Sequence, residues 1–138
     1  MELTEKQKNR IEKISQKCSL ALLLLFGSQV TGQTHKESDF DIAYIAEKQL
    51  NLKQESQFIV DLNGIFKTEK VDLTNLKNAS PLLVFGIFQN CQILYQNQKD
   101  PLLFARLRVY SFKRYIETKP FYELKFQRLR KKLVKVAG

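Results

Sequence analysis

With 138 residues and 43% hydrophobic content, the sequence is long enough for one domain with a real core and is not typical of a disordered chain. No apolar stretch reaches the roughly 18 residues of a membrane span, and no secretory signal is apparent at the charged N-terminus. The net charge of +9 is uneven, because the last 33 residues hold 11 Lys and Arg against 2 Asp and Glu. Such asymmetry concerns partners and not the fold.

The isolated cysteines and the single histidine give little sign of chemistry. Cys18 and Cys91 lie in apolar surroundings, which favours reduced thiols in a cytoplasmic protein over a disulfide or a metal site. His35 lies in a polar stretch without a Cys or His nearby, so we expect it to be solvated.

The chain opens with a predicted helix. Thr4 and Gln7 can form a capping box, so the helix is expected to start near residue 5. Ile11, Ile14 and Cys18 then give an apolar stripe at helical spacing.

The next stretch is the most informative part of the sequence. An apolar run at residues 22–26 ends at Gly27 and Ser28, and a polar connection of ten residues follows. Asp39 and Asp41 then lead into a second apolar run. Short apolar runs bounded by turn signals predict buried strands, here joined by a tight turn and a polar connection.

The two aspartates lie one residue apart at the start of the second strand. Alternate strand residues share a face, so Asp39 and Asp41 are predicted to point the same way, with Phe40 turned into the core. Two such charges repel unless a cation neutralises them, and carboxylate oxygens suit Mg²⁺ or Mn²⁺. Gly27 allows close backbone approach, and Ser28 adds a hydroxyl at a turn that can hold phosphate.

A helix, either continuous or interrupted at Asn63 and Gly64, is predicted at residues 51–66, and a strand is predicted at residues 70–76. Asp72 lies within that strand. It is either an edge carboxylate that accepts local hydrogen bonds or, if the strand pairs beside the Asp39 strand, a third acid of one cluster.

The rest of the chain completes an alternating pattern of helices and strands. Ser80 and Pro81 are expected to start a helix that reaches about residue 89, and a last strand is predicted at residues 91–95. The order of elements predicts an α/β (α+β) domain with a small mixed sheet covered by helices and with the carboxylates at one rim.

Two helices are predicted at the C-terminal end. The first starts at Asp100 and Pro101 and runs to about Thr118, where Pro120 is expected to break it. The second is strongly basic and has one apolar stripe, formed by Tyr122, Phe126, Leu129 and Leu133.

The pattern of Gly27, Ser28, Asp39, Phe40 and Asp41 resembles the signature of the DNA polymerase β-like nucleotidyltransferases. The short length and the flanking residues look most like minimal nucleotidyltransferase (MNT) proteins, many of which are antitoxins paired with a HEPN-domain ribonuclease toxin. The resemblance covers roughly residues 20–95. It implies residues 1–100 as the nucleotidyltransferase domain and residues 101–138 as a basic helical extension packed on it.

The resemblance implies an enzyme that transfers AMP from ATP to a hydroxyl, here a tyrosine of the HEPN toxin, and thereby neutralises that toxin. Asp39 and Asp41 would bridge two Mg²⁺ ions, with Mn²⁺ as an alternative, and Asp72 would bind the ion that activates the nucleophile. Gly27 and Ser28 would hold the β- and γ-phosphates. The basic C-terminal helices would dock the toxin.

Two other functions stay open on the sequence alone. Gln29 stands where an arginine often follows the Gly-Ser pair, which is compatible with a weak enzyme that neutralises its toxin by binding only. A nucleotidyltransferase acting on a nucleic-acid end or on a small molecule is the other alternative. Lys36 is expected to be solvated, and a contact from Lys36 to the triphosphate is the alternative interpretation.

Overall fold

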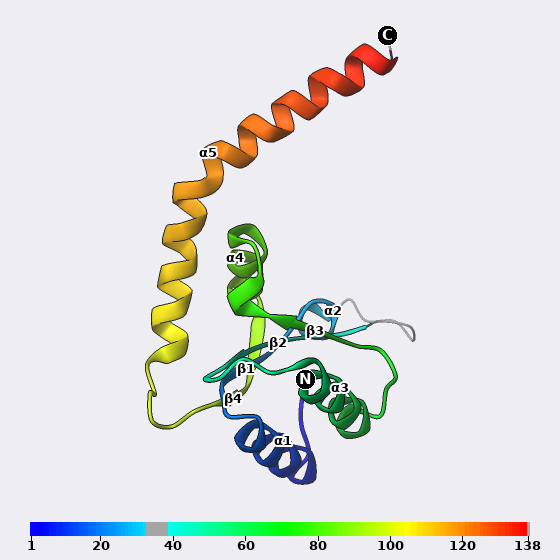
Figure 1. The fold of residues 1–138 in the computed structure, drawn as a ribbon, viewed down its shortest axis with the longest axis vertical. Coiled ribbons are helices and arrows are strands. Elements are labelled where there is room, and N and C mark those ends of the chain that lie inside the picture. The colour runs from blue at the N-terminus through cyan, green and yellow to red at the C-terminus, as the bar shows by residue number, and fades with distance from the viewer. Residues whose placement is uncertain (33–38, 138) are drawn as a thin grey trace.

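The computed structural model describes residues 1–32 and 39–137. Its elements follow in the order α1 (Glu5–Lys17), β1 (Leu20–Phe26), α2 (Ser28–Thr31), β2 (Phe40–Ala46), α3 (Leu52–Phe66), β3 (Val71–Asn75), a short 3₁₀ helix η1 (Leu76–Asn78), α4 (Pro81–Gln89), β4 (Cys91–Gln96) and α5 (Leu103–Ala137). Figure 1 shows these elements along the chain.

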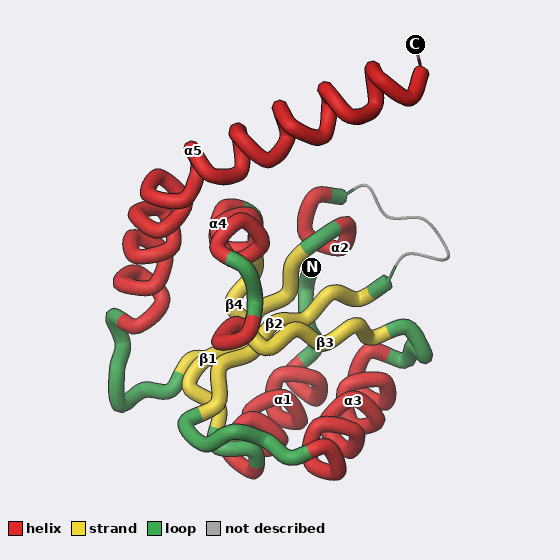
Figure 2. The backbone as a smooth tube through the Cα atoms, turned by 45° about the horizontal axis from the view of Figure 1, so that its top comes forward, coloured by secondary structure: helices red, strands yellow, loops and turns green. Residues whose placement is uncertain are grey.

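The strands form one mixed four-stranded sheet in the order β3-β2-β1-β4. Strand β1 is antiparallel to both of its neighbours, whereas β2 and β3 run parallel. Helices α1 and α3 cover one face, and α4 with the first part of α5 covers the other (Figure 2). The fold class predicted from the alternating pattern is therefore confirmed.

The apolar run of β1 is explained by burial on both sides of the sheet. Leu23 and Leu25 enter the core below α1 and α3, while Leu22 and Leu24 enter the second core below α4. All four side chains are fully buried. A central strand between two helical layers reads as a continuous hydrophobic run because neither of its faces meets water.

Two predicted helix starts are confirmed by their capping contacts. The Thr4 hydroxyl accepts from the Gln7 N–H, and the Gln7 side chain accepts from the Thr4 N–H, which completes the capping box of α1. The Ser80 hydroxyl accepts from the Leu83 N–H, and Pro81 occupies the first turn of α4.

Helix α3 is continuous, so Asn63 and Gly64 do not interrupt it. Gly64 lies against α1: a Cβ there would come within 3.3 Å of the Arg10 guanidinium, whose Nη1 donates to the Gly64 carbonyl at 3.4 Å. A side chain at this exposed position would require only a small shift of the exposed Arg10 guanidinium, and Gly64 forms no turn within α3.

The expectation of a helix break at Pro120 is wrong. Residues Leu103–Ala137 form one helix with Pro120 inside it. A proline removes one N–H and kinks a helix, but the hydrogen bonds on either side can continue. The axis changes direction in the middle of α5 (Figure 1), and the C-terminal half projects away from the domain. No helix in the described part of the chain is long and apolar enough to cross a membrane.

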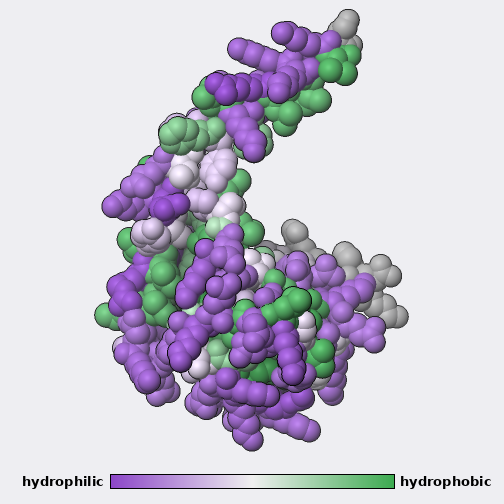
Figure 3. Space-filling model, viewed as in Figure 1, coloured by the Kyte–Doolittle hydropathy of each residue, from purple (hydrophilic) through white to green (hydrophobic). Residues whose placement is uncertain are grey.

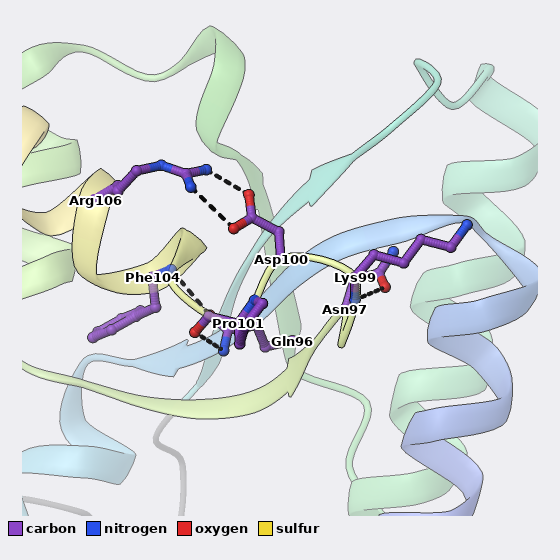
Figure 4. A network of polar contacts seen from close by, with 7 residues as sticks. All are labelled: Gln96, Asn97, Lys99, Asp100, Pro101, Phe104 and Arg106. Carbon is purple, nitrogen blue, oxygen red and sulfur yellow. Dashed lines mark hydrogen bonds and ion pairs between the residues drawn. The ribbon is translucent and has the colours of Figure 1, made fainter.

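Polar contacts fix the junction between β4 and α5 (Figure 4). The Gln96 side chain accepts from the Phe104 N–H at 2.9 Å and donates to the Pro101 carbonyl at 3.2 Å. Asp100 accepts two hydrogen bonds from the Arg106 guanidinium, one of them at 3.0 Å. The start of α5 is thereby tied to the last strand, at Leu103 instead of the predicted Asp100.

Candidate active site

A row of four side chains crosses the sheet at the end of β1. Phe26 is opposite Asp41 on one side and opposite Cys91 on the other, and Asp41 is opposite Asp72. Residues in register on neighbouring strands share a face. Ala43, two residues after Asp41, lies in the core below α4, so the row belongs to the α4 face.

The pairing of Asp41 with Asp72 confirms the strand arrangement that the sequence left conditional. Strands β2 and β3 are parallel neighbours, and the backbones of such paired strands are about 5 Å apart. Asp72 is exposed and Asp41 is half-buried. The two carboxylates therefore meet at the open rim of the sheet.

Asp39 stands directly before β2 and is exposed. Ladder pairing starts next to it, where the Phe40 N–H donates to the Lys70 carbonyl at 2.8 Å. The Phe40 ring turns to the opposite face and packs on Phe66 with ring centroids 5.1 Å apart. Strand alternation then leaves Asp39 on the same side as Asp41.

Gly27 makes the closest approach to the carboxylates. Its backbone has φ 77° and ψ −152°, a region that is essentially restricted to glycine. A Cβ on Gly27 would lie far inside van der Waals contact with the Asp41 Oδ2 and only 3.1 Å from its Cγ. The backbone of the turn after β1 is therefore in close contact with the Asp41 carboxylate.

The same turn starts the short helix α2. The Gly27 carbonyl accepts from the N–H groups of Val30 and Thr31 at 3.1 and 3.2 Å. Ser28 is the first residue of α2, and no side chain caps that helix within the described residues. Gly27 and Ser28 thus lie beside the carboxylates at this rim of the sheet, as the spacing in the sequence predicted. The three acids Asp39, Asp41 and Asp72 are called the carboxylate rim below.

The electrostatics of the rim reflect its three carboxylates. Burial raises the pKa of Asp41 above its usual value, and the negative charges of Asp72 and Asp39 raise it further. Three neighbouring carboxylates favour a bound cation, and their oxygen donors are those preferred by Mg²⁺ and Mn²⁺. Among the described residues, however, no group of three or more His, Cys, Asp or Glu side chains is arranged as a ready-made cage for one ion.

Sequence reasoning missed two members of the row. Cys91 shares it because β4 pairs with β1, and no local pattern shows which strands are neighbours. Burial raises the pKa of the Cys91 thiol, which keeps it protonated and unsuited to act as a nucleophile. Phe26 lies between Cys91 and Asp41 in the row and packs against the core below α4. His35 and Lys36 lie outside the described residues.

Comparison with known proteins places this geometry in a family. A model of the family described as "Polymerase beta, Nucleotidyltransferase" matches residues 8–100. The protein adenylyltransferase MntA of Shewanella oneidensis is 34% identical over a match that covers 62% of this chain and 61% of that protein. MntA of Aphanizomenon flos-aquae is 31% identical, with 59% and 60% covered. The chain thus spans about 60% of the length of these curated relatives.

Solved structures show the same architecture. A crystal structure of a toxin-antitoxin with AMP-PNP superposes with a TM-score of 0.74 at 25% identity, covering 89% of this chain and 98% of that one. A tri-AMPylated S. oneidensis HEPN toxin in complex with its MNT antitoxin gives 0.61 at 24% identity, covering 88% and 98%. The second likeness concerns the fold alone. Since the family model matches more than half of its residues, this chain belongs to the polymerase β nucleotidyltransferase family.

Proposed function

We propose that this protein is an MNT antitoxin that transfers AMP from ATP to a tyrosine hydroxyl of a HEPN toxin and so neutralises it. The observation that carries the proposal is the position of Asp41, which lies between Asp72 on the next strand and the Gly27 backbone at the turn. The names of the two MntA relatives and of the HEPN toxin complex support the choice of substrate and partner. We place the reaction in the cytoplasm.

The carboxylate rim suits a bound metal. Asp39, Asp41 and Asp72 supply only oxygen donors, and their mutual repulsion is relieved by a cation. They would hold Mg²⁺, as two ions, with Mn²⁺ as an alternative. When bound, the metal would neutralise charge on the triphosphate and on the oxygens that attack and leave.

The remaining chemistry comes from the protein's own groups. Gly27 and Ser28 bind the β- and γ-phosphates through backbone N–H groups and the Ser28 hydroxyl, and so orient the α-phosphate toward the acceptor. The acceptor oxygen bonds to the α-phosphorus while the bond between the α-phosphorus and the oxygen that bridges to the β-phosphate breaks, and pyrophosphate leaves. A carboxylate oxygen of Asp72, on the exposed edge strand, accepts the proton of the attacking hydroxyl. Gly27 also restricts Asp41 by contact, which keeps this carboxylate pointed at the rim.

The acceptor is carried by the partner. The rim is open, with Asp39 and Asp72 both exposed, so that a segment of another protein can reach it. The partner is held by the basic helix α5, whose excess of Lys and Arg attracts an acidic surface. The transfer thus takes place between two docked proteins, and the acceptor is not enclosed in a deep pocket.

A transfer assay tests the proposal. The protein is mixed with the HEPN protein encoded beside it, Mg²⁺ and ATP, and the HEPN protein is weighed by intact mass spectrometry. We expect a gain of one or more AMP units, which Asp39→Ala with Asp41→Ala abolishes while thermal unfolding stays cooperative. The matched control, Glu2→Ala with Glu12→Ala, removes the same charge from exposed positions near the N-terminus, away from the rim and from α5, and should keep the transfer.

The assay also separates the alternatives. A stable complex without any gain of mass would refute the transfer and leave an antitoxin that acts by binding. A gain of mass that survives the loss of both aspartates would place the chemistry elsewhere. Neither a gain nor a complex would refute the partner and direct attention to nucleic-acid or small-molecule acceptors.

A further inference from the structure

The last part of α5, residues 121–137, projects beyond the domain and is called the arm below (Figure 1). Its large apolar side chains are exposed: Phe126 is 50% exposed, Leu129 52% and Leu133 60%. In Figure 3 apolar side chains gather along the underside of the arm, and hydrophilic ones crowd its upper side. An exposed apolar stripe of this kind marks an interaction surface.

Five apolar side chains of the arm follow a regular spacing, whereas Phe121, Leu124 and Val134 lie outside it. The five recur after four, three, four and three residues, which is the pattern of a helix that packs along another helix. We call this set the seam, and it consists of Tyr122, Phe126, Leu129, Leu133 and Val136.

The seam continues an interface that is already formed in the first half of α5. There Phe104 and Leu107 pack on the core below α4, and the Tyr115 ring stacks on Phe85 of α4 with centroids 4.1 Å apart. Ser111, on the same stripe, is 2% exposed. The face of α5 that packs on α4 therefore runs on past the end of α4 onto the arm.

Charges beside the seam disfavour pairing with a second copy of the chain. Residues 121–137 hold six Lys and Arg and one acid, Glu123, which lies 3.9 Å from Lys119 of the same helix. In a parallel pair Lys125 would face Arg130 of the second copy, and in an antiparallel pair it would face Lys132. Like charges at these flanking positions decide partner choice in helical pairs.

We propose that the arm pairs side by side with an amphipathic helix of another protein whose seam is apolar and whose flanking residues are Asp and Glu. The proposal rests on the proposed function only in taking this partner to be the toxin. Apolar residues at alternating spacing supply burial, and the basic flanks supply selectivity. A single-stranded nucleic acid is less suited, because it stacks its bases on aromatic side chains, and Leu129, Leu133 and Val136 of the seam are aliphatic.

The test uses synthetic helices as probes of the full-length protein. One peptide of about three heptads carries Leu at the seam positions and Glu at the flanks, and a second carries Lys at the flanks. Calorimetry should show binding of the Glu peptide, weakened several-fold when salt rises from about 0.05 to 0.5 M, and no binding of the Lys peptide. Leu129→Asn with Leu133→Asn should weaken binding of the Glu peptide at least about tenfold.

The control variant is Gln127→Asn with Val134→Asn, which adds the same two asparagines on the opposite side of the arm. It places the same two asparagines in the helix, with a smaller loss of helix propensity at Val134 because valine and asparagine have similar propensities, and it should bind the Glu peptide as the unchanged protein does. An equal loss of peptide binding in both variants would show that the seam is not the binding surface. The proposal would also be overturned by self-association of the protein alone, or by tighter binding of a single-stranded RNA that ignores both variants.

The two proposals fail in different ways. If the HEPN protein gains no AMP but the Glu peptide still binds through the seam, the transfer is refuted and the arm is supported as a docking surface. If AMP is transferred but binding of the peptide and of the HEPN protein does not depend on Leu129 and Leu133, the docking surface is refuted and the transfer activity is supported.

Discussion

Replacement of Gly27 by alanine tests the contact on which the candidate site is built. Two costs are expected. The backbone at φ 77° and ψ −152° is strained for alanine by about 1–3 kcal/mol. The added Cβ, 3.1 Å from the Asp41 Cγ, also forces the carboxylate out of its position, which costs about 0.5–1.5 kcal/mol for an off-rotamer side chain.

A double-mutant cycle with Asp41→Ala separates these costs. Without the carboxylate only the backbone strain remains, so Gly27→Ala should destabilise the Asp41→Ala protein by about 1 kcal/mol less than it destabilises the unchanged protein. Unfolding in urea at pH 7 measures all four proteins. Gly27→Ala should also weaken ATP binding, because the displaced carboxylate and the altered turn flank the proposed phosphate site.

Gly32→Ala is the matched control. Gly32 also has a positive φ, 78°, but a Cβ there meets nothing within 4 Å among the described residues. Its replacement should cost about 1 kcal/mol from conformation alone and leave ATP binding intact. If Gly27→Ala and Asp41→Ala add within about 0.5 kcal/mol, the contact does not restrain Asp41 and the reasoning is refuted.

The remaining predictions concern the charge of the rim and the bend in α5. Burial and the charges of Asp72 and Asp39 raise the pKa of Asp41, so the ionised carboxylate lowers the free energy of unfolding. This destabilisation is complete at pH 7 and is relieved as the pH falls through the raised pKa. Asp41→Asn should therefore raise the thermal midpoint at pH 7 in EDTA, with a gain that fades on acidification, and a lower midpoint would contradict this account. Pro120→Ala should leave the helical circular dichroism at low temperature nearly unchanged, because the residues around Pro120 are already helical, and should delay loss of the arm's helical signal on heating, because proline costs about 3 kcal/mol relative to alanine inside a helix. A large rise in helical signal at low temperature would show that the arm of the unchanged protein is not helical.

The position of the carboxylates could be predicted from the sequence because it depends on local periodicity. Alternation in β2 puts Asp39 and Asp41 on one side, and a single further assumption, that the next strand pairs beside β2, brings Asp72 to them. The turn at Gly27 and Ser28 could be predicted from the abrupt end of an apolar run.

Other features depend on contacts between distant parts of the chain. The strand order β3-β2-β1-β4, and with it the place of Cys91 in the row, follows from packing that no local pattern records. The sequence predicted that Gly27 allows a close approach, but not that the approaching group is the carboxylate of Asp41. The break predicted at Pro120 is absent because the helix bends there and continues, whereas a proline normally ends a helix.

The length of the arm has a kinetic consequence. Its 17 residues extend about 25 Å past the bend, so a protein held there stays within molecular reach of the carboxylate rim. In the proposed transfer, tethering turns the encounter of acceptor and nucleotide into an event within one complex, at an effective concentration in the millimolar range. The proposed acceptor tyrosine would then need almost no affinity of its own for the rim. Loss of the arm should appear as a higher KM for the partner with an unchanged kcat, and concentrated partner should restore the rate.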